Sequence, residues 1–345
     1  MDRLFDKIGK AALLVSVFVI LAGCNYGSQS IFTAAAKEPA QRAAWIAYWD
    51  LDAGKRDLSR LGHKVDKVSY FGAYFDKEDR LFIPAELGDK KIQDRKQEGQ
   101  EIYLTLVNDK QNADGSVILK DMEILHRLFS NDKTMERHIA EIIALTLQGG
   151  YDGLEIDYER VWKDGETGRS FSRFVDKLYA EALKNNLKVR IVLEPSVPFA
   201  VASLPQGPEY VVMVYNLYGL HSGPGPKADR EFIQKTLTRM KALPGEKSVA
   251  LSTGGCLWGD NGKKNFLTEA EARSLALSHA VKPKRDEASQ CLVFSYQDGG
   301  ISYEVWYADV ETLNYWIDIV KEHGINNISL WRLGGNMDIN RIKAI

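Results

Sequence analysis

Short apolar runs alternate with longer segments of helical periodicity along most of this 345-residue chain. Runs of this kind are typical of buried strands, and strands that alternate with helices pair in parallel. Eight such units predict an α/β fold whose strands close into a (β/α)8 barrel, the TIM barrel. A doubly wound sheet is the alternative, but no Gly-x-Gly-x-x-Gly motif follows any of the runs. The eight candidate strands are residues 45–50, 67–75, 101–107, 151–158, 188–193, 210–215, 248–252 and 327–331.

The seventh and eighth candidate strands are separated by a segment long enough to hold a small element of its own. Residues 268–281 have helical periodicity, and residues 291–307 predict a hairpin that turns at Asp298-Gly-Gly. Residues 310–322 predict the helix that belongs to the barrel. We therefore expect a small α+β insertion over about residues 258–308. The chain stops soon after Trp331, so the eighth helix has room for only one or two turns.

The composition is that of a folded globular protein and excludes several classes of function. Apolar residues make up 45% of the chain and charged residues 27%, which argues against disorder. The 45 basic residues are balanced by 47 acidic ones, which argues against a nucleic-acid partner. We also expect a monomer. Three cysteines are too few for a disulfide scaffold, and the sequence leaves open whether Cys256 and Cys291 pair. The six histidines lack the spacing of metal ligands, so we expect no metal and no cofactor.

The N-terminus has the pattern of an export signal. Three basic and two acidic residues precede a 12-residue apolar run at 11–22, which is too short to span a membrane. The run ends in Leu21-Ala-Gly-Cys24, which resembles the lipobox of bacterial lipoproteins and implies that Cys24 is lipidated. Residues 1–23 are then the signal peptide, 24–42 a flexible tether and 43–345 the barrel. We expect an exported protein anchored by lipid to the bacterial cell membrane; ordinary secretion and an uncleaved anchor are the alternatives.

The fourth candidate strand carries a row of acidic side chains. Because side chains alternate along a strand, Glu155, Asp157 and Glu159 share one face, with neighbours about 6.6 Å apart. Inside a barrel this row is buried, where mutual repulsion favours a proton on at least one carboxyl group. A proton held near neutral pH is what a general acid needs. The alternative is an ordinary strand whose acids face solvent.

The segment Asp152-Gly-Leu-Glu-Ile-Asp-Tyr-Glu159 resembles the Asp-Gly-x-Asp-x-Asp-x-Glu signature of glycoside hydrolase family 18, the chitinase family. The resemblance extends from Trp45 to about Asn336 and is closest to the branch of bacterial spore-cortex and spore-germination hydrolases. Supporting segments are residues 125–131, 213–216, 223–226, 303–309 and 329–334. The resemblance implies a glycosidase that acts on N-acetylglucosamine-containing glycans, either peptidoglycan or chitin-like polymers.

The resemblance also implies a role for each matching residue. Glu159 would protonate the glycosidic oxygen, and Asp157 would orient the N-acetyl group of the substrate, whose carbonyl oxygen attacks the anomeric carbon. Tyr215 would donate a hydrogen bond to that acetamido group. Trp331 would form the apolar floor under the sugar, because a flat aromatic face suits the C–H face of a pyranose.

The sequence departs from the family pattern at several positions near the site. Glu155 and Asn216 each stand where the pattern has Asp, and Glu194 ends the fifth strand where a small residue is expected. The usual Ser-x-Gly-Gly of the third strand is replaced by residues 105–108. We expect substrate-binding roles for Glu155, Asn216, Glu194, Trp331 and Trp258.

Two other functions remain open at this point. The chain could be a lectin-like barrel that binds a glycan without cleaving it, although it retains Glu159, Asp157 and Tyr215 together. It could also be a glycosidase that uses two carboxylates, such as Glu159 and Glu194. The last hypothesis predicts cleavage of substrates that lack an N-acetyl group, which the family mechanism forbids.

Overall fold

The structure is a computed structural model that describes residues 40–88, 96, 99–112, 114 and 116–343. The predicted signal peptide, Cys24 and most of the predicted tether lie outside the described residues. Within the described ranges, none of the helices combines the length and the apolar character that crossing a membrane requires.

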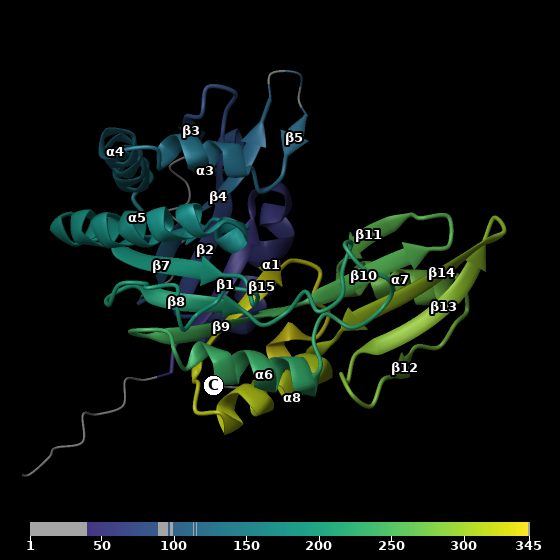
Figure 1. The fold of residues 1–345 in the computed structure, drawn as a ribbon. Coiled ribbons are helices and arrows are strands. Elements are labelled where there is room, and N and C mark those ends of the chain that lie inside the picture. The colour runs from purple at the N-terminus through teal and green to yellow at the C-terminus, as the bar shows by residue number, and fades with distance from the viewer. Residues whose placement is uncertain (1–39, 89–95, 97–98, 113, 115, 344–345) are drawn as a thin grey trace, which may run out of the picture. The chain divides into compact units, whose positions relative to one another are not determined.

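Eight parallel strands close into a barrel (Figure 1). Each strand pairs with the next in chain order, and β1 pairs with both β2 and β15 to complete the ring. The predicted fold class is confirmed. The barrel strands are β1 (Arg42–Ala47), β2 (Lys67–Phe75), β4 (Glu101–Gln111), β6 (Gly153–Asp157), β7 (Lys188–Leu193), β8 (Glu209–Met213), β9 (Lys247–Ser252) and β15 (Asn327–Leu333).

Helices and short hairpins connect the barrel strands. The antiparallel strands β3 (Leu81–Phe82) and β5 (Val117–Ile118) pair with the ends of β2 and β4. The segment between β7 and β8 contains no helix among the described residues. The helices around the barrel are α1 (Leu51–Leu61), α2 (Ala85–Gly88), α3 (Met122–Leu128), α4 (Asp132–Gln148), α5 (Gly165–Lys184), α6 (Arg230–Met240) and α8 (Val310–Glu322), with 3-10 turns at Tyr48–Asp50, Gly62–Lys64, Val161–Lys163 and Ile339–Arg341.

Local sequence explains where the longer helices begin. Asn131 and Thr134 form a capping box at the start of α4, and Asp164 accepts hydrogen bonds from two backbone N–H groups of α5. Asp229 and Asp309 cap α6 and α8 in the same way. Each cap satisfies backbone donors that would otherwise lack a partner. Among the described residues after β15, the chain forms a 3-10 turn at Ile339–Arg341.

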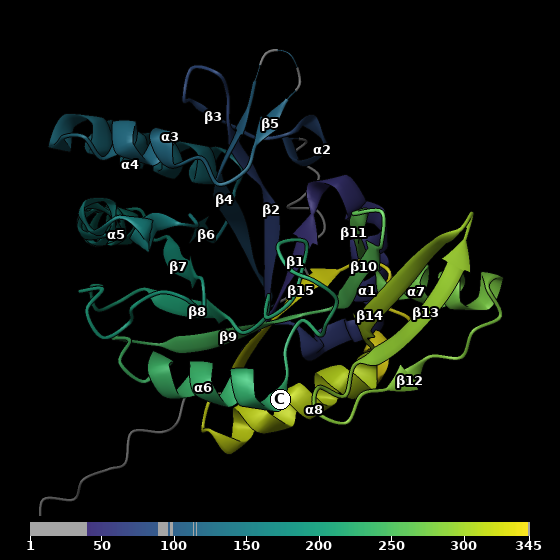
Figure 2. The ribbon, with the colours of Figure 1, turned by 45° about the vertical axis from the view of Figure 1, so that its right-hand side comes forward.

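The insertion between β9 and α8 is a five-stranded antiparallel sheet with one helix (Figure 2). It begins at Gly254, a few residues earlier than predicted, because β10 follows β9 almost directly. Cys256 and Cys291 are buried free thiols in this region, so the disulfide alternative is not realised. The elements are β10 (Gly254–Gly259), β11 (Lys264–Leu267), α7 (Glu269–Ser278), β12 (Lys284–Arg285), β13 (Leu292–Asp298) and β14 (Ile301–Ala308).

The interior of the barrel is divided into a polar layer and an apolar collar. The polar layer contains Arg190, which is 1% exposed, together with buried Glu155 and Glu209. The collar consists of Trp45, Phe71, Val107, Val192, Val211, Met213, Tyr215 and Ala250, with Trp331 packed against it. Asp157 pairs in register with the collar residue Val107, so the second acid of the row lies at the level of the collar.

Candidate active site

The general-acid candidate Glu159 lies just beyond the carboxyl end of β6, where catalytic groups of such barrels are found. Asn108 of β4 fixes its backbone. The Asn108 Oδ1 accepts a hydrogen bond of 2.9 Å from the Glu159 N–H, and its Nδ2 donates one of 3.2 Å to the Glu159 carbonyl. Asn108 is 1% exposed. Two hydrogen bonds to a buried side chain of the neighbouring strand therefore hold the backbone of the acid in place.

The Glu159 side chain is only 17% exposed and has charged neighbours on two sides. Lys120 forms an ion pair with its Oε2, and the charge of Glu194 acts on it from the end of β7. Burial raises the pKa of Glu159 to about 7; Lys120 opposes this shift and Glu194 adds to it. The group can therefore hold a proton near neutral pH and release it to a substrate.

Asp157 lies beneath Glu159 and has an unused polar atom. Its Oδ1 is buried and has no hydrogen-bond partner among the residues that the structure describes. Burial raises its pKa well above the usual value, and the charges of Glu159 and Glu155 raise it further. A buried polar atom without a partner is costly, which makes this oxygen a natural acceptor for a donor on a bound ligand.

Tyr215 and Trp331 bring a phenol and an indole ring to the same end of the barrel. Tyr215 is 6% exposed, and burial together with the charge of Asp157 raises its pKa well above the usual value, so it stays a neutral donor. Trp331 is partly exposed and packs edge-on against Trp45 and Phe71, with ring centroids 5.9 and 4.7 Å apart. The site thus combines a protonated acid, an unsatisfied acceptor, a phenol donor and an aromatic wall.

This arrangement agrees with what comparison with known proteins finds. The sequence profile of glycosyl hydrolases family 18 matches residues 26–336. The chain belongs to this family. The glycoside hydrolase class predicted from the acidic strand is confirmed at the level of family membership, and so is the predicted similarity to the spore-hydrolase branch.

Relatives within family 18 include spore proteins and chitinases. The chain is 24% identical to the uncharacterized glycosylase YvbX of Bacillus subtilis over 63% of this chain and 67% of that protein. The spore cortex-lytic enzyme SleL of Bacillus cereus superposes with a TM-score of 0.73 at 18% identity, covering 87% of this chain and 72% of that one. A chitinase of Chromobacterium violaceum superposes with a TM-score of 0.71 at 17% identity, covering 87% and 96%. The chain spans between 54% and 67% of the length of the curated relatives that it matches.

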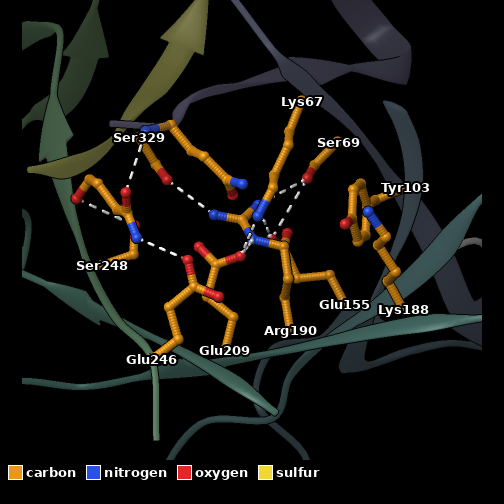
Figure 3. A network of polar contacts seen from close by, with 12 residues as sticks. Lys67, Ser69, Tyr103, Glu155, Lys188, Arg190, Glu209, Glu246, Ser248 and Ser329 are labelled. Carbon is orange, nitrogen blue, oxygen red and sulfur yellow. Dashed lines mark hydrogen bonds and ion pairs between the residues drawn. The ribbon is translucent and has the colours of Figure 1, made fainter. Parts of the chain in front are cut away.

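Glu155 departs from the family 18 signature, and the structure corrects the substrate-binding role that we predicted for it. It is fully buried, and Arg190 donates a 2.5 Å hydrogen bond to its Oε2 (Figure 3). Thr105 donates a bond of 2.7 Å to Oε1, and the Trp45 indole N–H donates to the same atom. Burial raises the pKa of Glu155, and Arg190 opposes this shift. Glu155 therefore supports the site from below and does not face a substrate.

Trp258 is the second correction. It is 5% exposed, and its indole N–H is shared between the carbonyls of Gly219 and Ser222 at 3.2 Å each. Trp258 thus links the loop after β8 to the inserted sheet, and its buried ring is not accessible to a sugar.

Asn216 directly follows Tyr215 with a φ of 68°, and its Oδ1 accepts a 3.4 Å hydrogen bond from Lys227. Substrate contact by Asn216, Glu194 and Trp331 stays a prediction.

Three residues of the site were not found by sequence reasoning. Asn108 stands within the segment that replaces the third-strand motif of family 18, which was the available signal. Lys120 and Arg190 carried no such sequence signal, because a single basic residue at a strand end or in an apolar run is usually a solvent-facing side chain. Both reach the acids from the neighbours of β6, Lys120 from the segment after β4 and Arg190 from β7, over 39 and 35 positions of sequence.

Proposed function

We propose that this protein is a membrane-anchored glycosidase that hydrolyses bonds of N-acetylglucosamine in peptidoglycan or a chitin-like glycan. The observation that carries the proposal is the pairing of Glu159, which can hold a proton near neutral pH, with the unpartnered buried oxygen of Asp157. The names of the relatives, a spore cortex-lytic enzyme and a chitinase, support the same substrate class.

The reaction that fits these groups is substrate-assisted and retaining. Asp157 accepts a hydrogen bond from the acetamido N–H, and the acetamido carbonyl oxygen forms a bond to the anomeric carbon. The glycosidic bond breaks as Glu159 gives its proton to the leaving oxygen. Water then attacks the anomeric carbon from the vacated side, Glu159 takes the proton of that water, and the bond to the acetamido oxygen breaks. The Tyr215 hydroxyl donates to the acetamido group, and Trp331 packs under the ring.

A two-carboxylate reaction between Glu159 and Glu194 fits poorly. Carboxyl groups that act on opposite sides of a sugar stand about 5 Å apart in retaining enzymes and farther apart in inverting ones. The Glu194 Oε2 accepts a 2.6 Å hydrogen bond from the N–H of Arg160, the residue next to Glu159, so Glu194 lies beside the acid rather than on the other side of a sugar.

Dependence on the acetamido group is the test of the mechanism. We expect the soluble domain, from about residue 40, to release products with a reducing N-acetylglucosamine end from chitin oligosaccharides or purified peptidoglycan. Fully deacetylated chitosan oligosaccharides should remain uncut, because they lack the attacking carbonyl. Mass spectrometry of the products checks both results. Equal cleavage of the deacetylated substrates would contradict the substrate-assisted step.

A non-catalytic sugar-binding barrel is the second candidate, and one contact favours it. The ion pair with Lys120 stabilises the ionised form of Glu159, which cannot act as an acid. If the chain retains chitin oligosaccharides or peptidoglycan in a pull-down but releases no products, this candidate replaces the glycosidase.

Membrane anchoring rests on the lipobox-like segment that ends at Cys24. We expect the full chain, expressed in a bacterial host, to fractionate with membranes, because acyl chains on Cys24 hold it there. Cys24→Ser removes the acylation site and should move the protein out of the membrane fraction, as measured by fractionation and by labelling with a radioactive fatty acid. The same substitution at Cys256 is the control and should leave both readouts unchanged, since that thiol is buried.

A further inference from the structure

Glu159 lies between two ionisable side chains that come from the segments after β4 and β7, the two strands that flank β6. Lys120 lies in the turn between β5 and α3, where its φ is 56° and its N–H donates a 2.7 Å hydrogen bond to Asp109. Glu194 directly follows β7, and its Oε2 accepts a 2.6 Å bond from the Arg160 N–H. The backbone of Lys120 and the side chain of Glu194 are therefore each held by a hydrogen bond of their own.

The two neighbours act on the proton of Glu159 with opposite signs. The ammonium group of Lys120, in an ion pair with Glu159, stabilises the ionised acid. The negative charge of the nearby Glu194 disfavours a second negative charge on Glu159 and so favours the protonated acid. Without Glu194 the ammonium would favour the ionised acid, and without Lys120 the proton would be held too tightly to leave.

Other ionisable groups face these three side chains, and the charge of Lys120 acts on three of them, Asp109, Asp157 and Lys227. Asp157 lies below Glu159, and Tyr215 approaches from β8. Some of these ionisable groups lie near Glu159 itself, and others lie near Lys120. They are Asp109 on β4, Lys120 before α3, Asp157 on β6, Arg160 after β6, Glu194 after β7, Tyr215 after β8 and Lys227 before α6.

We propose that Lys120 and Glu194 are positioning residues that act on Glu159 in opposite directions, Lys120 favouring its ionised form and Glu194 its protonated form. Together they set the pH range over which the acid carries its proton. The inference rests on the proposed function, because its main readout is glycan hydrolysis.

The test is the pH dependence of kcat/KM for Lys120→Met, Glu194→Gln and the double variant. The basic limb of this profile reports the general acid of the free enzyme. We expect Lys120→Met to move it up by about one pH unit and Glu194→Gln to move it down by about one unit. The double variant should fall between the two. A limb that stays in place in both single variants, or that moves the same way in both, would overturn the inference.

Two further measurements distinguish control of the Glu159 proton from a purely structural role of the two side chains. Lys120→Arg keeps the positive charge and should leave the limb at the wild-type position, whereas a purely structural role would lower the plateau in every variant without moving the limb. Titration of the 13C-labelled Glu159 carboxyl by NMR in the same variants needs no turnover. If the wild type cleaves none of the glycans, the proposed function fails, and the direction of these NMR shifts still decides the inference.

Discussion

Glu159→Gln should remove most of the hydrolysis, lowering kcat/KM by about 10²- to 10⁴-fold, the typical contribution of a general acid. The amide keeps the shape of the protonated side chain but has no proton to give to the leaving oxygen. Binding should survive, since Asp157, Tyr215 and Trp331 are untouched. Kinetics with a chitin oligosaccharide and isothermal calorimetry on the same ligand measure the two effects separately.

A matched variant and a stability measurement guard this result. Glu166→Gln changes an exposed glutamate at the start of α5 and should retain the wild-type rate. In the folded protein the pKa of Glu159 is raised to about 7. The contribution of Glu159 to the free energy of unfolding is therefore fully present below its unfolded pKa and is lost as the pH rises through 7. Glu159→Gln should therefore be more stable than wild type at pH 8, by up to about 3 kcal/mol. More than a tenth of wild-type activity in Glu159→Gln would rule out its role as the acid.

The barrel was predictable because its buried parallel strands are short apolar runs bounded by amphipathic helices. The bounds of β2 and β7 were predicted to the residue. The first strand was placed at 45–50, whereas β1 spans Arg42–Ala47 and Tyr48–Asp50 is a 3-10 turn. Aromatic residues are common in strands and at barrel mouths alike, so composition did not locate the end of this strand.

The acids of the site were predictable because one strand carries them at a spacing of two residues. The spacing does not show how deep inside the barrel each acid lies. Glu155 and Asp157 point inward alike, yet Glu155 lies below the collar against Arg190, and Asp157 lies at the collar with an unpartnered oxygen. The partners that distinguish Glu155 come from β7, β4 and β1, and strand periodicity does not predict which side chains of other strands meet inside a barrel.

Arg190→Met should destabilise the protein by about 3 to 5 kcal/mol, the usual cost of removing one partner from a buried ion pair. Arg190 donates to Glu155 and Ser69 through one nitrogen and to Ser329 through another, and it forms an ion pair with Glu209 at 3.2 Å (Figure 3). Methionine fills similar volume but leaves Glu155 as a buried charge without a cation. Urea unfolding, followed by tryptophan fluorescence at pH 7, measures the loss.

A neighbouring lysine on the same strand provides the control. Lys188 forms an ion pair with Glu101, but its side chain is 60% exposed, so Lys188→Met should cost less than about 1 kcal/mol. The loss in Arg190→Met should also depend on pH. Without the guanidinium, the effect of burial on Glu155 is opposed only by the hydrogen bonds from Thr105 and Trp45, so its folded pKa rises further, and the stability gap to wild type should narrow at pH 5 and widen at pH 8. Adding Glu155→Gln to Arg190→Met should recover part of the loss at pH 8, because the double variant no longer buries an unpaired charge. Equal losses at both pH values would show that Arg190 contributes through packing against Trp45 and Tyr103 rather than through charge.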